Sequence, residues 1–132
     1  MNILLVDDEA DFLETLSKRL TRRGLTVSKA PGGQEALEFL SGTSVDAVVL
    51  DVKMPGMSGL EVLREIKSRW PQTEVIMLSG HADVQVAVKG LEMGAFDYLM
   101  KPTDIEELLY KLQDAGKRRN LGEKAAGNAA EE

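Results

Sequence analysis

The sequence has 132 residues, of which 43% are hydrophobic and 29% are charged, as in a single soluble globular domain. It contains no cysteine and one histidine, which excludes disulfides, thiolate metal sites and a zinc site made of histidines from one chain. The formal net charge of −6 argues against a broad basic surface, so no nucleic-acid partner is expected for the domain itself.

The first ten residues, MNILLVDDEA, lack a basic start and become acidic at once, unlike a secretory signal peptide. Nowhere does an apolar stretch approach the roughly 20 residues that a membrane-spanning helix needs. We therefore expect a cytoplasmic location and no membrane partner.

Apolar runs and repeats divide the first part of the chain into alternating elements. Short apolar runs predict buried strands, and apolar residues that recur every three or four positions predict amphipathic helices. Gly24 and the turn at 31–33 separate these elements. In chain order we expect a strand at 3–6, a helix at 9–23, a strand at 25–30, a helix at 34–40 and a strand at 45–50.

The second part of the chain continues the alternation. Two Ser/Thr-x-x-Glu patterns, beginning at Ser58 and Thr103, predict capping boxes, in which side chains satisfy free N–H groups at a helix start. Pro71 ends the first of these helices. The expected elements are a helix at 58–70, a strand at 74–78, a helix at 84–94 marked by Val84, Val88 and Leu91, a strand at 95–100, and a last helix with Ile105, Leu108, Leu109 and Leu112 on its apolar face.

Strands and helices alternate five times without a hairpin signal, which predicts an α/β fold. We expect a doubly wound five-stranded parallel sheet with helices on both faces and right-handed crossovers. The flavodoxin-like strand order 2-1-3-4-5 fits this number of strands. After Lys117 the apolar periodicity is lost, so we expect one domain at 1–117 and a flexible linker or disordered tail at 118–132. The cations at 117–119 are expected from the helix dipole alone.

Polar residues end four of the predicted strands: Asp7-Asp8, Asp51, Ser79 and Lys101. The carboxyl ends of parallel strands lie at one edge of a sheet, where open α/β sheets bind ligands. Three carboxylates that meet there either raise their pKa values or surround a cation, and Mg²⁺ prefers such oxygen ligands. A lysine and a hydroxyl beside them suit an oxyanion, so the set predicts phosphoryl transfer with Asp51 as the nucleophile.

The motifs at these strand ends together resemble the receiver domain of bacterial two-component response regulators. They are the Asp-Asp after the first strand, the phrase DVKMPGMSG at 51–59, the Ser-Gly after the fourth strand and the Lys-Pro after the fifth. The resemblance covers about Asn2 to Lys117. It implies that Asp51 takes a phosphoryl group from the phosphohistidine of a sensor histidine kinase. The chain would then be a signalling switch that catalyses only its own phosphorylation and dephosphorylation.

The resemblance also implies a set of metal ligands. Asp8 and Asp51 would bind Mg²⁺ directly, and the backbone carbonyl of Lys53 would be a third ligand. Asp7 would act mainly through water. Mn²⁺ is expected to substitute for Mg²⁺, and no further cofactor is expected.

Five more positions match the family's switch. Lys101 would pair with the phosphoryl oxygens, and its bond to Pro102 would be cis. Ser79 would move its hydroxyl onto the phosphoryl group, Gly80 would leave room beside it, and Tyr98 would turn inward. The surface of the fourth helix, fifth strand and fifth helix would then change shape for a downstream output domain or protein. A homodimer through this surface is left open.

Lys53 and His81 follow Asp51 and Ser79 by two positions each. In this family these positions flank the phosphoryl group, and we expect the two side chains to restrict or orient the attacking water. The alternative is that both are solvated loop side chains. The stretch at 80–102 is most similar to receivers that precede transcription-activating ATPase or DNA-binding domains.

Three other interpretations fit parts of the pattern. A phosphatase of the haloacid-dehalogenase type also uses an aspartate nucleophile, but its DxD motif needs an acid where Lys53 stands. A flavin-binding electron carrier should have Ser, Thr and Gly in the phosphate loop after the first strand, whereas the acids at 7–11 would repel a phosphate. A receiver-like module that binds partners without phosphorylation is the third. It is not supported, because no member of the acidic and switch set is missing.

Overall fold

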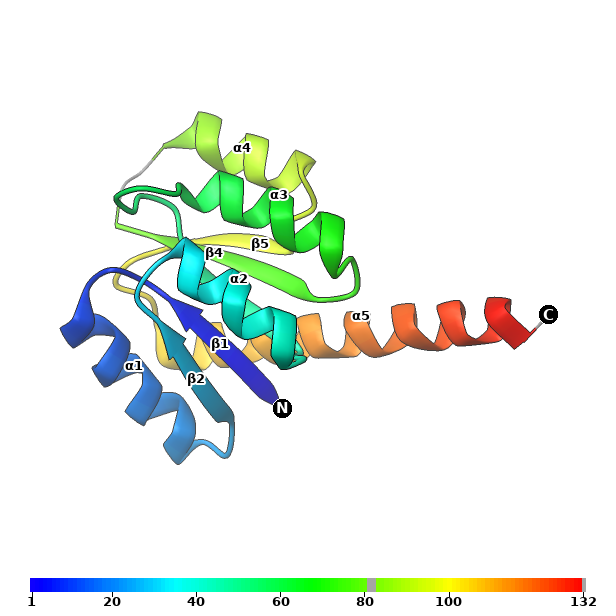
Figure 1. Ribbon diagram of the computed structural model, residues 1–132. Helices are drawn as coiled ribbons and strands as arrows, with labels where there is room; N and C mark the ends of the chain where they lie inside the picture. Colours follow the sequence, from blue (N-terminus) through cyan, green and yellow to red (C-terminus); the bar gives the residue numbers. More distant parts are fainter. Residues whose placement is uncertain (81–82, 132) are drawn as a thin grey trace.

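Five parallel strands form one sheet in the order β2-β1-β3-β4-β5 (Figure 1), which confirms the predicted fold class. The computed structural model describes residues 1–80 and 83–131, and the side chains of 1–80 and 83–122. The strands are β1 (Asn2–Val6), β2 (Thr26–Ala30), β3 (Ala47–Asp51), β4 (Glu74–Ser79) and β5 (Asp97–Met100).

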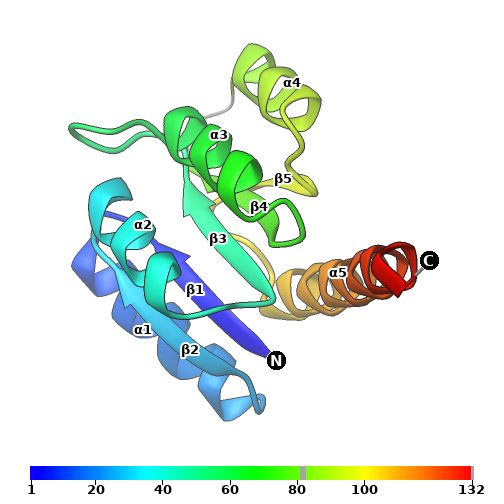
Figure 2. The same cartoon turned by 45° about the vertical axis from the view of Figure 1, so that its right-hand side comes forward.

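Helices cover both faces of this sheet. They are α1 (Ala10–Arg22), α2 (Gly33–Gly42), α3 (Gly59–Arg69), α4 (Val84–Glu92) and α5 (Ile105–Glu131). The α1 and α5 helices lie on one face, and α2, α3 and α4 lie on the other (Figures 1 and 2). Each face therefore has its own hydrophobic core. In the described part of the chain, no helix combines the length and apolar character needed to cross a membrane.

The β3 strand lies in the middle of the sheet, and all of its residues are buried. Val48 and Leu50 pack in the core beneath α2 and α3. Ala47 and Val49 point the other way and pack in the core with α1 and α5. A strand covered on both faces needs an apolar residue at every position, which explains the continuous run. The run ends at Asp51, so this acid stands at the carboxyl edge on a backbone held by packing on both sides.

The loop after β3 is fixed by the start of α3. Ser58 caps this helix, as predicted, because its hydroxyl accepts a hydrogen bond from the N–H of Glu61 at 3.3 Å. The N–H of Gly59 donates to the carbonyl of Val52 at 2.9 Å. A Cβ at Gly59 would lie 2.5 Å from the carbonyl oxygen of Asp51, so glycine is required for α3 to begin this close to the strand.

The start of α5 differs from the predicted capping box. Asp104, rather than Thr103, precedes the helix and accepts its free N–H groups. The carboxylate of Asp104 accepts from the N–H of Glu106 at 2.8 Å, and its backbone carbonyl accepts from the N–H of Leu108 at 3.0 Å. Thr103 as the cap is therefore wrong. Aspartate is as good a cap as serine or threonine, and here it stands one position nearer to the first helical residue.

Beyond Lys117 the chain remains helical, because α5 continues to Glu131. This differs from the flexible linker or disordered tail that the sequence predicts for 118–132. That expectation relied on the loss of apolar periodicity and on the Gly, Ala, Asn and Glu content of the segment. Its Ala, Glu and Arg residues nevertheless favour helix, and residues that extend an existing helix need no new nucleus. The domain limit at Lys117 stays a prediction.

Two arginines attach this extension of α5 to the sheet. Arg119 is 13% exposed and donates to the carboxylate of Asp46 at 3.3 Å. The same carboxylate accepts the backbone N–H of Asn2 at 2.7 Å. Arg118 lies 3.8 Å from the buried carboxylate of Glu74. Because β1, β3 and β4 begin at this edge, α5 is fixed at the edge opposite the acidic residues. Since α5 continues to Glu131, the cations at 117–119 lie in the middle of the helix, where its dipole has little effect, and the expectation that the dipole alone explains them is wrong.

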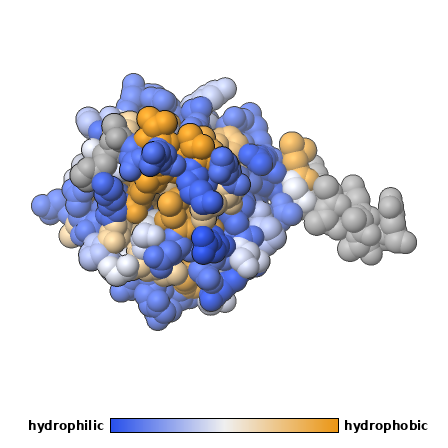
Figure 3. All heavy atoms as spheres, turned by 90° about the horizontal axis from the view of Figure 1, so that it is seen from above, coloured by the Kyte–Doolittle hydropathy of each residue, from blue (hydrophilic) through white to orange (hydrophobic). Residues whose placement is uncertain are grey.

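The α4 helix turns apolar side chains toward solvent. Val84, Val88 and Leu91 are 78%, 49% and 47% exposed. Gly90 is the residue of this helix that is buried, and a Cβ there would collide with the sulfur of Met77. The helix therefore approaches the sheet through a small residue. Figure 3 looks at the molecule from above, which is the α4 side of Figure 1, and shows hydrophobic residues gathered on this face.

Candidate functional site

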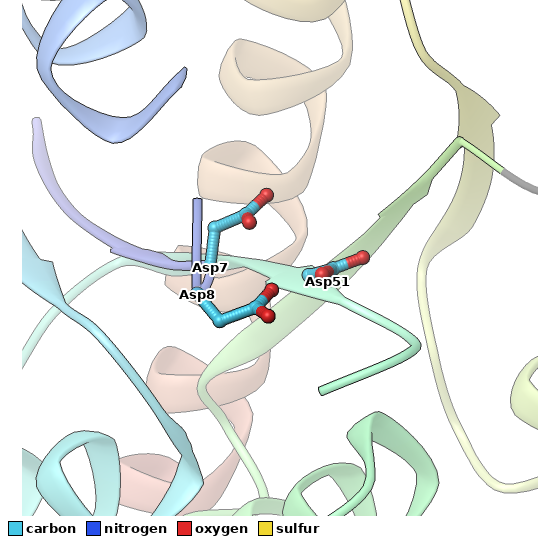
Figure 4. A group of neighbouring side chains, drawn as sticks. All are labelled: Asp7, Asp8 and Asp51. Atoms are coloured by element: carbon cyan, nitrogen blue, oxygen red, sulfur yellow. The ribbon is translucent and has the colours of Figure 1, made fainter. Parts of the chain in front are cut away.

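Three carboxylates meet at the carboxyl ends of β1 and β3 (Figure 4). They belong to Asp7, Asp8 and Asp51, and one oxygen atom of each lies within 4.8 Å of the others. Asp7 and Asp51 are only 3% and 6% exposed, whereas Asp8 is exposed. Water therefore solvates the buried pair poorly. The site therefore concentrates negative charge at one point of the sheet edge.

This concentration of charge changes the protonation of Asp51. Burial is the largest cause, and the neighbouring charges of Asp7 and Asp8 add to it, so the pKa of Asp51 rises from 3.8 to about 6. Lys101 opposes the rise but does not cancel it. A divalent cation among the three carboxylates would remove the repulsion. Carboxylate oxygens in this number suit Mg²⁺ or Mn²⁺, so the residues present fit the ion that the sequence predicts.

Lys101 supplies the positive charge of the site. Its side chain is 11% exposed, and its Nζ lies 2.6 Å from Asp7 Oδ2, 3.3 Å from Glu9 Oε1 and 3.9 Å from Asp51 Oδ1. The Nζ also lies 4.3 Å from the centre of the Phe12 ring, a cation–π contact. Burial alone lowers the pKa of Lys101, but the hydrogen bond and charge of Asp7 outweigh it, so the pKa is raised. The ammonium is therefore charged at neutral pH.

The backbone of β4 and β5 places Lys101 beside the carboxylates. Its N–H donates to the carbonyl of Ser79 at 2.7 Å. The Lys101–Pro102 peptide bond is cis, the isomer that the sequence resemblance implies. Ser79 is buried at the end of β4, next to β3 in the sheet. Gly80 follows it and is exposed, and a Cβ there would lie 3.9 Å from the Lys101 side chain, in ordinary contact.

The remaining predicted residues lie at different distances from the carboxylates. Tyr98 is on β5, in register with Met77, and its half-buried ring packs against the core beneath α2 and α3. Lys53 is exposed in the loop after β3. His81 lies outside the described residues. The structure thus brings Asp7, Asp8, Asp51 and Lys101 together, with Ser79 on the adjoining strand.

Two partners of Lys101 are missing from the predicted set. Glu9 and Phe12 both contact its ammonium; Glu9 directly precedes α1, and Phe12 is in the first turn of that helix. Glu9 directly follows Asp7 and Asp8 in the sequence, so its position next to the predicted site could have identified it as a site residue. Phe12 carries no such signal, because its spacing is that of the apolar face of α1.

Comparison with known proteins gives the family of the chain. The sequence profile of the response regulator receiver domain matches residues 3–113. The DNA-binding transcriptional regulator NtrC of Escherichia coli strain K12 is 39% identical over 113 residues, which is 86% of this chain and 24% of that protein. Response regulator MprA of Mycolicibacterium vanbaalenii is 40% identical over 130 residues, which is 98% of this chain and 56% of that protein. The chain thus spans a quarter to about half of these relatives.

A solved structure has the same fold. The crystal structure of a response regulator receiver domain protein from Clostridium thermocellum superposes with a TM-score of 0.87 at 37% sequence identity. The superposition covers 91% of this chain and 97% of that one. Fold, sequence profile and relatives agree, and the chain therefore belongs to the response regulator receiver domain family of two-component systems.

Proposed function

We propose that this receiver domain is a Mg²⁺-dependent phospho-acceptor, in which Asp51 takes a phosphoryl group from a sensor histidine kinase. One observation carries the proposal. The buried carboxylate of Asp51 ends β3 within reach of two more carboxylates and 3.9 Å from the ammonium of Lys101. This arrangement offers a nucleophile, a set of oxygen ligands for a cation, and a counter-charge for the transferred group.

In the proposed step, a carboxylate oxygen of Asp51 forms a bond to phosphorus. The bond between phosphorus and the imidazole nitrogen of the kinase phosphohistidine breaks, and its electron pair returns to the imidazole. Mg²⁺, when bound, neutralises charge on the carboxylates and on the phosphoryl oxygens. Asp8, Asp51 and the Lys53 carbonyl would hold it directly, with Asp7 acting through water. Asp51 must be ionised to attack, and the cation favours that form.

Lys101 and Ser79 would sense the transferred group. The ammonium of Lys101 would move from its present carboxylate partners to pair with a phosphoryl oxygen, and the hydroxyl of Ser79, at the end of the neighbouring strand, would move onto the same group. Movement of Ser79 would let Tyr98 turn further into the core. Lys53 and His81 would restrict the water that hydrolyses the acyl phosphate, which sets its lifetime.

The readout would be the surface made by α4, β5 and α5. Exposed apolar residues on this surface support a role in binding: Val84, Val88, Leu91, Met100 and Tyr110. We propose that a downstream output domain or protein, or a second copy of the chain, binds there. Since NtrC is named a DNA-binding transcriptional regulator, we also propose that the output is transcriptional and the location cytoplasmic.

We propose a signalling switch rather than an enzyme that acts on other substrates. A phosphatase of the haloacid-dehalogenase type would need an acid two positions after its nucleophile, and Lys53 stands there with an exposed side chain. A module that binds partners without phosphorylation does not need a buried carboxylate with a raised pKa beside a buried lysine, and this chain has both.

The test is incubation with acetyl phosphate and Mg²⁺, followed by intact-protein mass spectrometry. The wild type should gain one phosphoryl group, and Asp51→Asn should gain none. Asp11→Asn is a matched control, because it removes an exposed carboxylate from the nearby start of α1 and should still be phosphorylated. EDTA should abolish the gain in the wild type and in Asp11→Asn. A folded wild type that gains no phosphoryl group under these conditions would contradict the proposal.

A further inference from the structure

The ammonium of Lys101 is held mainly by one segment of the chain, the link from β1 into α1. Asp7 lies 2.6 Å away, Glu9 lies 3.3 Å away, and the ring of Phe12 lies 4.3 Å away. Asp51 is the most distant of its carboxylate partners, at 3.9 Å. The lysine side chain is 11% exposed, so water solvates the ammonium poorly and these partners decide where it stays.

The two closer carboxylates differ in how they hold the lysine. The side chain of Asp7 is 4% exposed, and its Oδ1 accepts the backbone N–H of Glu9 at 2.9 Å. Its position is therefore fixed by the fold. The side chain of Glu9 is 65% exposed and can turn into water. Glu9 thus provides a contact that is made in the resting site and is easily given up.

A phosphoryl group on Asp51 would compete for the same ammonium. It places negative oxygens beyond the Asp51 carboxylate, and Lys101 must approach them to neutralise their charge. The Nζ lies 3.9 Å from Asp51 Oδ1, outside hydrogen-bond distance, so it must shift to bond a group carried by Asp51. In such a shift the 3.3 Å contact with the exposed Glu9 carboxylate gives way more easily than the 2.6 Å contact with buried Asp7, so Glu9 and the phosphoryl group compete for Lys101.

We propose that Glu9 is a positioning residue that retains the Lys101 ammonium on the α1 side of the site and so opposes its transfer to a phosphoryl group on Asp51. This inference rests on the proposed function. Glu9 acts through Lys101 and touches no reacting atom. Glu9 thus weakens the binding of a phosphoryl-like group at Asp51, because the lysine must first leave Glu9. The nucleophile and the metal ligands are unchanged by this effect.

The test uses beryllofluoride with Mg²⁺ as a non-covalent stand-in for the phosphoryl group, titrated while backbone amide NMR signals are followed. Glu9→Gln keeps the size of the side chain and removes its charge. Exposed ion pairs contribute up to about 1 kcal/mol, so half-saturation should occur at about two- to five-fold lower beryllofluoride concentration than in the wild type. Asp11→Asn removes one charge from the same segment without an ion pair to Lys101 and should shift half-saturation less.

A second pair of variants separates contact through Lys101 from a general field effect. In a Lys101→Ala background, adding Glu9→Gln should leave the weaker beryllofluoride binding unchanged, because the coupling partner is gone. The inference is overturned if Glu9→Gln matches Asp11→Asn, or if its effect persists without Lys101. A wild type that binds no beryllofluoride overturns the proposed function and this inference with it, whereas normal wild-type binding with no Glu9 effect overturns the inference alone.

Discussion

Replacing Asp51 by asparagine should make the folded protein more stable at neutral pH when no divalent cation is present. The carboxyl is 6% exposed, and burial together with the charge of Asp7 raises its pKa from 3.8 to about 6. The folded state therefore binds a proton at Asp51 more tightly than the unfolded chain does. Above both pKa values the ionised group disfavours folding by about 3 kcal/mol, because each unit of pKa difference corresponds to about 1.4 kcal/mol.

The gain depends on pH. Below pH 3.8 Asp51 is protonated in both states and contributes no difference. As the pH rises from 3.8 through about 6, the wild type loses stability that the asparagine variant keeps. The attraction to Lys101, 3.9 Å away, is already included in this pKa. We expect Asp51→Asn to be about 1–3 kcal/mol more stable at pH 7, and about 1 kcal/mol or less near pH 4.5.

Urea denaturation in EDTA, followed by the fluorescence of the single tryptophan, Trp70, measures this difference. Asp11→Asn is the control, and its stability should stay within about 0.5 kcal/mol of the wild type. Added Mg²⁺ should stabilise the wild type more than Asp51→Asn, because the proposed ion would bind the folded acidic site and Asp51 is one of its ligands. A variant no more stable than the wild type at pH 7, or a gain that is equal at pH 4.5 and pH 7, would refute the reasoning.

Three further substitutions test the framework around the site, each by its urea midpoint. Arg119→Ala should lower the free energy of unfolding by about 1–2 kcal/mol, because it leaves the carboxylate of Asp46 without its cation. The control Lys117→Ala, at an exposed position, should lower it by less than about 0.5 kcal/mol, and equal losses would contradict the anchoring contact. Ser58→Ala should cost about 1 kcal/mol through loss of the α3 cap, and no loss would mean that the cap is not used. Gly59→Ala should cost at least about 2 kcal/mol and weaken Mg²⁺ binding, since its Cβ would displace the backbone that carries the acidic site; wild-type Mg²⁺ affinity would argue against that close packing.

The sheet order and the position of the site were predictable because both depend on local patterns. Continuous apolar runs such as the one ending at Asp51 identify strands buried on both faces, and the alternation with helices requires parallel pairing. Once the strands are parallel, Asp7 and Lys101 must come to the same edge although 94 positions separate them. No side-chain contact has to be known for this step.

The parts that the sequence did not predict depend on tertiary contacts. The partners of Lys101 follow from the direction of its side chain, so Glu9 and Phe12 could not be assigned to it from spacing. The helical extension of α5 was missed because the apolar periodicity stops at Lys117, although an existing helix can continue without it. The attachment of this extension to the sheet depends on contacts such as that of Arg119, which lies far in sequence from its partner at Asp46. In α4 the apolar spacing is that of a buried helix, yet Val84 faces solvent. A pattern reports which side of a helix is apolar, and neighbouring elements decide whether that side is covered.

The anchored α5 helix has a mechanical consequence. It begins three residues after Pro102, beside the acidic edge, passes the opposite edge where Asp46 holds Arg119, and projects beyond the sheet (Figures 1 and 2). At 27 residues it is about 40 Å long. Arg119 is the fifteenth of these 27 residues, so its contact with Asp46 holds the helix near the middle. A tilt of α5 about this contact would move its first turn, near Lys101, and its projecting end in opposite directions.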